Sequence, residues 1–353
     1  MTQLAENPAY VEPVLAAERP FSTLSFDWMV TISAIWFIFG LYLDGWAHNN
    51  LGGLESFFTP WHAVFYSGFG AVTAVHGWQI WQNWRQGHGW KTAVPAGYTL
   101  SLLGIAIFAA GGAGDLAWHT LFGIEENIAA LFSPSHLTLI AGMVLIVTGP
   151  IRALGQRRGS PQGWLALFPM LLSLTFLFSL LTFITQFAYF PANPWLATSV
   201  SRVGFTGDAS QILGVLTSVF HSALLMGLLL PVVRRWHVPF GTVTLMLAVN
   251  ILLMSWMLDD YTGVPALVLA GLIGDGLLVG LGVGGGKRPF SFHLFAFLLP
   301  AILYALFLFT LTSTGRVWWV IHLITGIPVF TGCTGLLLSY LVLTPPSLQM
   351  RNE

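Results

Sequence analysis

The run DWMVTISAIWFIFGLYLDGWAH, residues 27–48, decides the fold of this chain. It is almost entirely apolar, and about 20 such residues in a helix cross the roughly 30 Å of hydrocarbon in a bilayer. The whole chain shares this composition, because 55% of its 353 residues are hydrophobic and only 8% are charged. An ordinary soluble domain is about 25% charged. The sequence therefore predicts an all-α, polytopic transmembrane helical bundle.

Ten apolar runs are long enough to be predicted as spans, and short connections between them favour helix hairpins. They are residues 27–48, 60–83, 95–119, 134–154, 163–189, 209–233, 238–258, 262–284, 289–312 and 316–343. The predicted transmembrane domain, residues 27–343, lies between an N-terminal tail, residues 1–26, and a C-terminal tail, residues 344–353. The N-terminal tail contains acids and prolines, which is not the pattern of a cleavable signal.

The lysines and arginines of the short loops predict the orientation of the chain. Loops after the odd-numbered spans hold only Arg202 and Arg316. Loops after the even-numbered spans hold Arg85, Lys91, Arg152, Arg157, Arg158, Arg234, Arg235, Lys287 and Arg288. This asymmetry predicts an integral protein of a prokaryotic cell or inner membrane with both termini in the cytoplasm. The single cysteine, Cys333, lies in an apolar run, so neither a disulfide framework nor a thiolate metal site is expected.

The first span ends with an acid and a histidine, and the second begins with another histidine. Asp44 and His48 are four residues apart, which places both on one face of a helix. Thr59 is a good N-cap and Pro60 suits the first helical position, so His62 falls in the first turn of the next helix. We expect the hairpin to bring His62 back to the first pair on the extracytoplasmic side.

The chain repeats this order in the next hairpin, where Ser133 and Pro134 precede the last histidine. One such stretch alone is more often a polar helix end, but two copies in the same order favour metal or proton chemistry. Aspartate with two histidines is a sensible ligand set for copper, zinc or iron. The repeated hairpins cover residues 27–83 and 95–154. The predicted metal ligands are Asp44, His48, His62, Asp115, His119 and His136.

Five further residues are weaker candidates for the metal site. Glu55, Glu125 and Glu126 lie in the loops of the two hairpins, where each can ligate, orient an imidazole N–H or remain a solvated charge. His221 and His322 lie in later even-numbered spans but lack a preceding acid and histidine pair. This favours hydrogen-bonded histidines between helices over added ligands.

Other polar residues in the spans leave their roles open. Asp275 lies between two glycines, where an ionisable group usually faces a cavity, a partner or a path. It is either a step on an ion or proton path or the polar partner of a neighbouring helix. His76 and His293 lie near the cytoplasmic ends of their spans, which leaves a b-type haem between them as a further alternative.

The first hairpin resembles the copper-ligand motif in the C subunit of the particulate methane and ammonia monooxygenase family. The resemblance is carried by Asp44, three residues, His48 and then Phe58-Thr59-Pro60-Trp61-His62 at the family's spacing. In the second hairpin the stretch between the histidines is longer by three residues. The resemblance covers only these two short hairpins. It implies that each binds copper and that the chain is a membrane monooxygenase-like protein.

Three classes of function are consistent with these residues. An enzyme would activate dioxygen or water on a lipid-soluble substrate at two adjacent ligand sets. A metal transport or homeostasis protein would use the same ligands as a loading site, with Asp275 and His221 along a path inward. A structural subunit would bind metal only for stability. The expected partners are the lipid bilayer and other membrane subunits or a second copy of the chain, and no nucleic-acid partner is expected.

Overall fold

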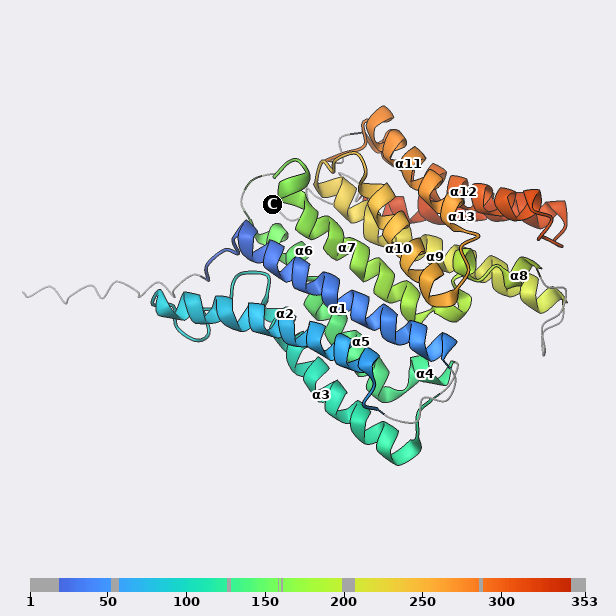
Figure 1. Cartoon of the computed structure of the whole chain (residues 1–353). Coiled ribbons are helices and arrows are strands. Elements are labelled where there is room, and N and C mark those ends of the chain that lie inside the picture. The colour runs from blue at the N-terminus through green and yellow to red at the C-terminus, as the bar shows by residue number, and fades with distance from the viewer. Residues whose placement is uncertain are drawn as a thin grey trace, which may run out of the picture.

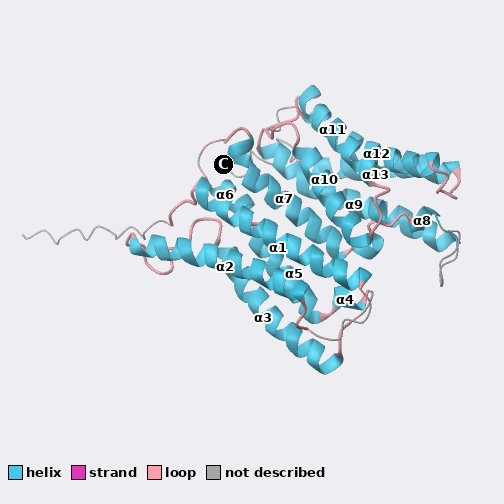
Figure 2. Ribbon diagram, viewed as in Figure 1, coloured by secondary structure: helices cyan, strands magenta, loops and turns pink. Residues whose placement is uncertain are grey.

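The computed structural model describes residues 19–51, 57–125, 128–157, 159, 161–198, 207–285 and 288–343. Helices are the regular structure of these residues, and no strand occurs among them. Figures 1 and 2 show long helices packed side by side in one bundle. The prediction of an all-α fold is confirmed.

The helices follow one another with short connections. The main elements are α1 (Leu24–Asn50), α2 (Pro60–Arg85), α3 (Thr99–Phe122), α5 (Pro134–Val147), α6 (Gly149–Gln156), α7 (Trp164–Ile184), α9 (Gly207–Arg235), α10 (Thr242–Leu258), α11 (Val264–Gly280), α12 (Pro289–Ser313) and α13 (Ile321–Val342). Short helical turns at α4 (Ala129–Phe132), η1 (Gln186–Ala188), η2 (Phe190–Ala192) and α8 (Trp195–Thr198) connect them.

Among the described residues, seven helices are long and apolar enough to cross a membrane. They are Leu24–Asn50, Thr99–Phe122, Pro134–Gln156, Trp164–Ile184, Ala209–Arg235, Pro289–Ser313 and Ile321–Val342. All ten predicted spans lie on helices, but α10 and α11 have only 17 residues each. Helix α2 is long enough but includes Gln79, Gln82 and Asn83. A membrane protein is therefore supported, while the count of ten spans and the orientation stay predictions.

Consecutive helices pack as hairpins, and these pairs make the most extensive contacts in the bundle. They are α1 with α2, α3 with α5, α10 with α11, and α12 with α13. Helix α7 lies at the centre, where most of its residues are buried against α10, α1, α9 and α5. The two Asp/His hairpins therefore lie on one side of α7, as Figure 1 shows.

Paired glycines allow α1 and α2 to approach closely. A Cβ atom on Gly40 would lie 2.6 Å from the Cα atom of Phe65, and one on Gly68 would lie 2.6 Å from the Cα atom of Phe37. Small residues permit such contact between helix backbones in membranes, where association depends on packing. Glycine is therefore required at both positions of this crossing.

The α3/α5 hairpin uses glycines in the same register. A Cβ atom on Gly111 would lie 3.2 Å from the backbone nitrogen of Leu139, and one on Gly142 would lie 2.8 Å from that of Phe108. In both hairpins the first glycine lies four residues before the aspartate, and the second lies six residues after the last histidine. The hairpins thus share a packing register as well as a ligand order. A repeat across the rest of the chain stays a prediction.

A buried ion pair holds the start of α1. Asp27 is 2% exposed, pairs with Arg157 and accepts a hydrogen bond from the Tyr98 hydroxyl at 2.8 Å. Arg157 also donates to the backbone oxygen of Ser22 at 3.0 Å. Because a buried charge without its partner is strongly destabilising, this loop arginine has a structural role. Sequence analysis used it only to predict orientation.

The variant Gly68→Ala tests the close approach of α1 and α2. Its methyl group would press on the Phe37 backbone, and overpacking of this kind costs about 1–3 kcal/mol. We expect a lower melting temperature of the protein in detergent, measured by circular dichroism. Gly70→Ala is the matched control on the same helix, because no atom lies within 4 Å of its added Cβ. Equal melting of the two variants would contradict the packing role of Gly68.

Candidate metal centre

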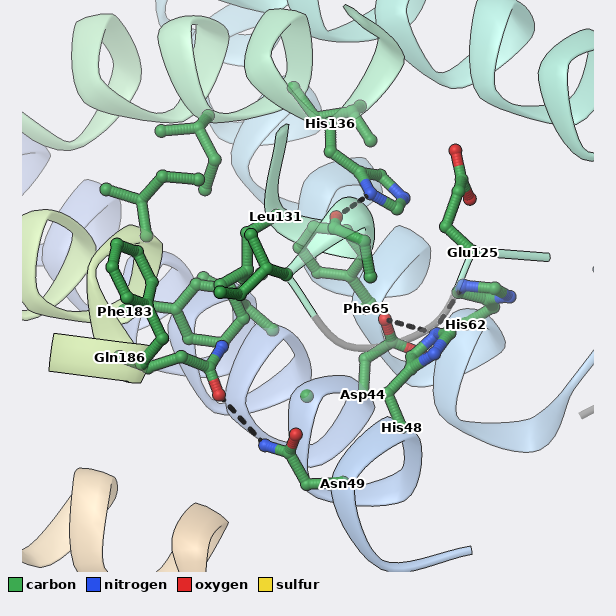
Figure 3. A pocket seen from close by; sticks show the side chains of 18 of the residues that line it. Asp44, His48, Asn49, His62, Phe65, Glu125, Leu131, His136, Phe183 and Gln186 are labelled. Atoms are coloured by element: carbon green, nitrogen blue, oxygen red, sulfur yellow. Dashed lines mark hydrogen bonds and ion pairs between the residues drawn. The ribbon is translucent and has the colours of Figure 1, made fainter. Parts of the chain in front are cut away.

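Asp44, His48 and His62 meet where α1 ends and α2 begins. The Nε2 atom of His48 lies 3.8 Å from Oδ2 of Asp44, and that of His62 lies 3.4 Å from Oδ1. One ligand atom from each residue lies within 4.8 Å of the other two. Figure 3 shows the three side chains converging. The predicted hairpin geometry of this first triad is confirmed.

Backbone contacts at the start of α2 determine which nitrogen of His62 faces the aspartate. The Thr59 hydroxyl accepts from the His62 backbone N–H at 3.2 Å, which caps the helix. The Nδ1 atom of His62 lies 2.6 Å from the carbonyl oxygen of Phe57. Because a carbonyl can only accept, Nδ1 carries the hydrogen and donates it. In a neutral imidazole, Nε2 then presents its lone pair to Asp44.

Asp115, His119 and His136 form the second triad at the end of α3 and the start of α5. The Oδ1 atom of Asp115 lies 3.4 Å from Nε2 of His119 and 3.1 Å from Nε2 of His136. The Ser133 hydroxyl caps α5 by accepting from the His136 backbone N–H at 3.3 Å. The Nδ1 atom of His136 donates to the carbonyl oxygen of Ala130. The second hairpin therefore repeats the geometry of the first.

Glu125 lies on the outer side of His119. Its Oε2 atom is 3.2 Å from Nδ1 of His119, while the Nε2 atom of that ring faces Asp115. A carboxylate on the second nitrogen of a ligand histidine fixes its tautomer and ring orientation. The Nδ1 atom of His119 also lies 3.3 Å from the carbonyl oxygen of Gly123, which can accept its hydrogen, and in the part of the chain that the structure describes neither oxygen of Glu125 has a hydrogen-bond partner. The role of Glu125 as a ligand, an orienting partner or a loop charge therefore stays a prediction. Glu55 and Glu126 lie outside the described residues.

Each triad places imidazole lone pairs opposite a carboxylate, and two acceptors repel unless a proton or a metal ion lies between them. Within the described part of the chain, Asp44 Oδ1, Asp115 Oδ1 and His119 Nε2 are buried without a hydrogen-bond partner. Buried polar atoms left in this way are costly. One metal ion in each triad would satisfy these atoms. Three protein ligands would also leave coordination positions open to water or substrate.

Both triads border one cavity of about 640 Å³. The ring of Phe57 packs against both, with its centroid 4.9 Å from that of His62 and 6.0 Å from that of His119. The amides of Asn49 and Gln186, joined by a hydrogen bond of 2.9 Å, lie across the cavity from His62 in Figure 3. The remaining walls are mainly apolar and include Leu41, Phe65, Leu131, Leu139, Ile140, Met143, Phe183 and Phe187.

His221 and His322 do not join either triad. The Nδ1 atom of His221 donates to the carbonyl oxygen of Thr217 at 2.8 Å, and its Nε2 atom lies 3.1 Å from the Thr185 hydroxyl. Its ring therefore connects α9 to the end of α7. His322 is exposed near the start of α13. The contacts of His221 agree with a hydrogen-bonded histidine between helices and not with an added ligand.

Asp275 is fully buried and caps the N-terminus of α10. Its Oδ1 atom accepts from the Val243 backbone N–H at 2.9 Å, and Oδ2 accepts from that of Thr244 at 3.0 Å. The Thr244 hydroxyl adds a bond of 2.6 Å. A carboxylate at a helix N-terminus is favourable. Of the two alternatives left open by the sequence, these contacts favour the role of Asp275 as a polar partner of a neighbouring helix over a step on an ion path.

His76 and His293 are separated by the fold. The Nδ1 atom of His76 donates to the Val72 carbonyl at 2.8 Å within α2, and that of His293 lies 2.6 Å from the Ser339 hydroxyl between α12 and α13. Figure 1 shows α2 and α12 on opposite sides of the bundle. A haem held between these two histidines is therefore excluded.

Comparisons with protein-family models, with curated proteins and with solved structures find no match. The resemblance to the C subunit of the monooxygenases therefore rests on the two motifs alone. The chemistry of the site rests on the geometry of the two triads.

The backbone acceptors of the site could not be predicted from the sequence. The Phe57 and Ala130 carbonyls orient His62 and His136, but a carbonyl has no side-chain signature. The amide of Asn49 had a signal, since it directly follows His48 at the end of an apolar run.

Metal stoichiometry tests whether the triads are separate sites. We expect elemental mass spectrometry of protein purified in mild detergent to find two ions per chain. His62→Ala and His136→Ala would each lose about one ion, because each keeps only two ligands in one triad. His322→Ala is the control and would keep both ions, since it joins neither triad. Equal metal content in all four proteins would contradict the ligand assignment.

The variant Glu125→Ala tests the orienting carboxylate of the second triad. Made together with His62→Ala, it leaves the second triad as the only complete one. Loss of such a partner weakens metal binding by roughly 10–100-fold. We expect this loss in competition titrations with a chelator, relative to His62→Ala alone. An unchanged affinity would show that Glu125 is a loop charge without influence on the metal.

Proposed function

We propose that this chain is a copper-dependent membrane oxidoreductase with monooxygenase-like activity on a hydrophobic substrate. The observation that carries the proposal is that two Asp-His-His triads border one cavity whose other walls include many apolar side chains. Imidazole and carboxylate ligands suit copper, and the motif resemblance of the first hairpin supports that metal. Zinc or iron would fit the same ligand set, and iron in particular is bound by two histidines and a carboxylate in oxygenases.

The residues of the chain would prepare the site for the metal and the substrate. The Phe57 and Ala130 carbonyls hold the Nε2 atoms of His62 and His136 inward, and the Gly123 carbonyl accepts from Nδ1 of His119, with the Glu125 carboxylate beside it. The apolar walls of the cavity would bind a hydrophobic molecule and exclude water from it. Bound copper would supply the activation of dioxygen.

Monooxygenation also defines the second substrate that the protein needs. One oxygen atom of dioxygen enters a C–H bond, and the other leaves as water after taking up two electrons and two protons. We propose a lipid-soluble hydroquinone as the reductant, because this class of two-electron donor diffuses within the bilayer. The cavity lies at the ends of α1 and α3, where the proposed donor would have to enter.

Metal transport or homeostasis is the second candidate. The position of both triads at helix ends favours it, because an ion can load there from one side of a membrane. Transport also needs a continuous polar path, and the oxygens of Asp275 are already bonded to the start of α10. A purely structural metal would require a saturated coordination shell. A metal ion held by only three protein ligands would keep coordination positions open to substrate, and this favours the enzyme over both alternatives.

We propose the lipid bilayer as the main partner of the outer helices. Large apolar side chains of α1, including those of Ile32, Trp36 and Phe39, are 46–60% exposed. In water such a surface would be unfavourable, whereas in a bilayer it contacts lipid. Other membrane subunits or a second copy of the chain remain the proposed protein partners.

Oxygen consumption tests the proposed function. With copper-loaded protein in lipid vesicles, a lipid-soluble hydroquinone and a series of alkanes, we expect alkane-dependent oxygen uptake and alcohol products. Ile140→Trp would fill part of the cavity and abolish this uptake while leaving copper content unchanged. Leu137→Trp is the matched control, because Leu137 lies on the same helix with its side chain 43% exposed.

Two results would overturn the proposal. Bound zinc or iron instead of copper in the native protein would remove the copper assignment. Stoichiometric copper without alkane-dependent oxygen uptake would favour transport, which uptake of copper into vesicles containing the protein would then measure.

A further inference from the structure

A second cavity lies at the opposite end of α3 from the metal centre. It has a volume of about 390 Å³ and is bordered by the start of α3, the end of α6 and the end of α9. Thr99 borders it, and Asp115 lies sixteen residues further along the same helix. At 1.5 Å per residue the two are roughly 24 Å apart along the helix axis. This distance places the second cavity near one surface of a membrane and the metal centre near the other.

Two arginines border the second cavity, and no carboxylate does so. Arg152 is held in place, because it donates to the carbonyl oxygens of Gly97 at 2.9 Å and Leu145 at 2.8 Å. Arg235 is held at one edge only. It donates to the carbonyl oxygen of Gly155 at 2.7 Å and stacks on Trp236 with 4.7 Å between guanidinium carbon and ring centroid.

A third guanidinium lies at the rim, because Arg19 donates to the hydroxyl of Thr99. Within the residues that the structure describes, the ion pairs involve other residues and none includes Arg19, Arg152 or Arg235. Positive charges brought together without an anion repel one another. A bound anion with several acceptor oxygens would offset this repulsion.

We propose that the second cavity binds the phosphate group of an anionic membrane lipid. The planar guanidinium group matches phosphate oxygens with paired hydrogen bonds. Basic pockets between membrane helices on the cytoplasmic side are suited to lipid headgroups, and the loop charges of this chain predict that side for this end. Leu100, which is 44% exposed, and Ile151 also border the cavity and provide apolar contact for the first acyl carbons.

Native mass spectrometry of the full chain in detergent tests this site. We expect the protein to retain added phosphatidylglycerol and to retain phosphatidylcholine much less. Arg235→Gln would weaken phosphatidylglycerol binding roughly tenfold, the effect of losing one charge-assisted hydrogen bond. Arg85→Gln is the matched control with the same change of charge, because Arg85 stacks on Trp81 and does not border the cavity.

Several results would overturn the proposal. Equal binding of the two lipids, or equal binding by Arg235→Gln and Arg85→Gln, would show that no such site exists. Retention of inorganic phosphate in place of lipid, with the same dependence on Arg235, would assign the cavity to free phosphate. The variant Arg235→Lys keeps the positive charge but cannot form two parallel hydrogen bonds to phosphate. We expect its affinity for phosphatidylglycerol to lie between those of the wild type and Arg235→Gln. An unchanged melting temperature of each variant, measured by circular dichroism in detergent, would show that the fold is intact, and this readout does not depend on the metal centre.

Discussion

The constraint on which this structure depends is a carboxylate facing imidazole lone pairs within an apolar bundle. Asp115 is 2% exposed, and its Oδ1 atom lies within 3.4 Å of two histidine nitrogens. Such an arrangement is stable only if a proton or a metal ion offsets the repulsion between the acceptors. The backbone carbonyls that orient His62 and His136, the carboxylate of Glu125 and the open cavity all act on this one feature.

The glycine crossings explain how each hairpin maintains that geometry. Gly40 and Gly68 bring α1 and α2 into backbone contact, and Gly111 and Gly142 do the same for α3 and α5. Each crossing fixes the axial position of one helix relative to the other. It therefore aligns the Asp-His pair at the end of the first helix with the histidine at the start of the second. The two triads nevertheless differ, since the side chain of Asp44 is 14% exposed and that of Asp115 only 2%. The carboxylate of the second triad is therefore the less exposed of the two.

Local sequence patterns predicted the helices and both ligand sets. Contacts between residues far apart in the sequence could not be predicted in this way. The helical segments and both ligand sets follow from apolar runs, caps and four-residue spacing, which act within one or two helical turns. Asp275 remained ambiguous in sequence because its partners, Val243 and Thr244, begin a different helix. The same limit applies to Arg157, whose partner Asp27 lies on α1. Hydropathy predicted ten spans, of which seven lie on helices long and apolar enough to cross a membrane among the described residues, while α10 and α11 are apolar but shorter.

The sequence by itself determined that the chain is helical, with helices apolar enough to cross a membrane and with two candidate Asp-His-His ligand sets, because hydrophobicity and helix periodicity are properties of neighbouring residues. Only the tertiary structure decided that both sets border one cavity, with Phe57 packed between their histidines and with walls from α1, α2, α5 and α7. It also decided that three arginines from separate segments gather at the opposite end. Contacts of this kind depend on how helices pack, and no local pattern encodes them.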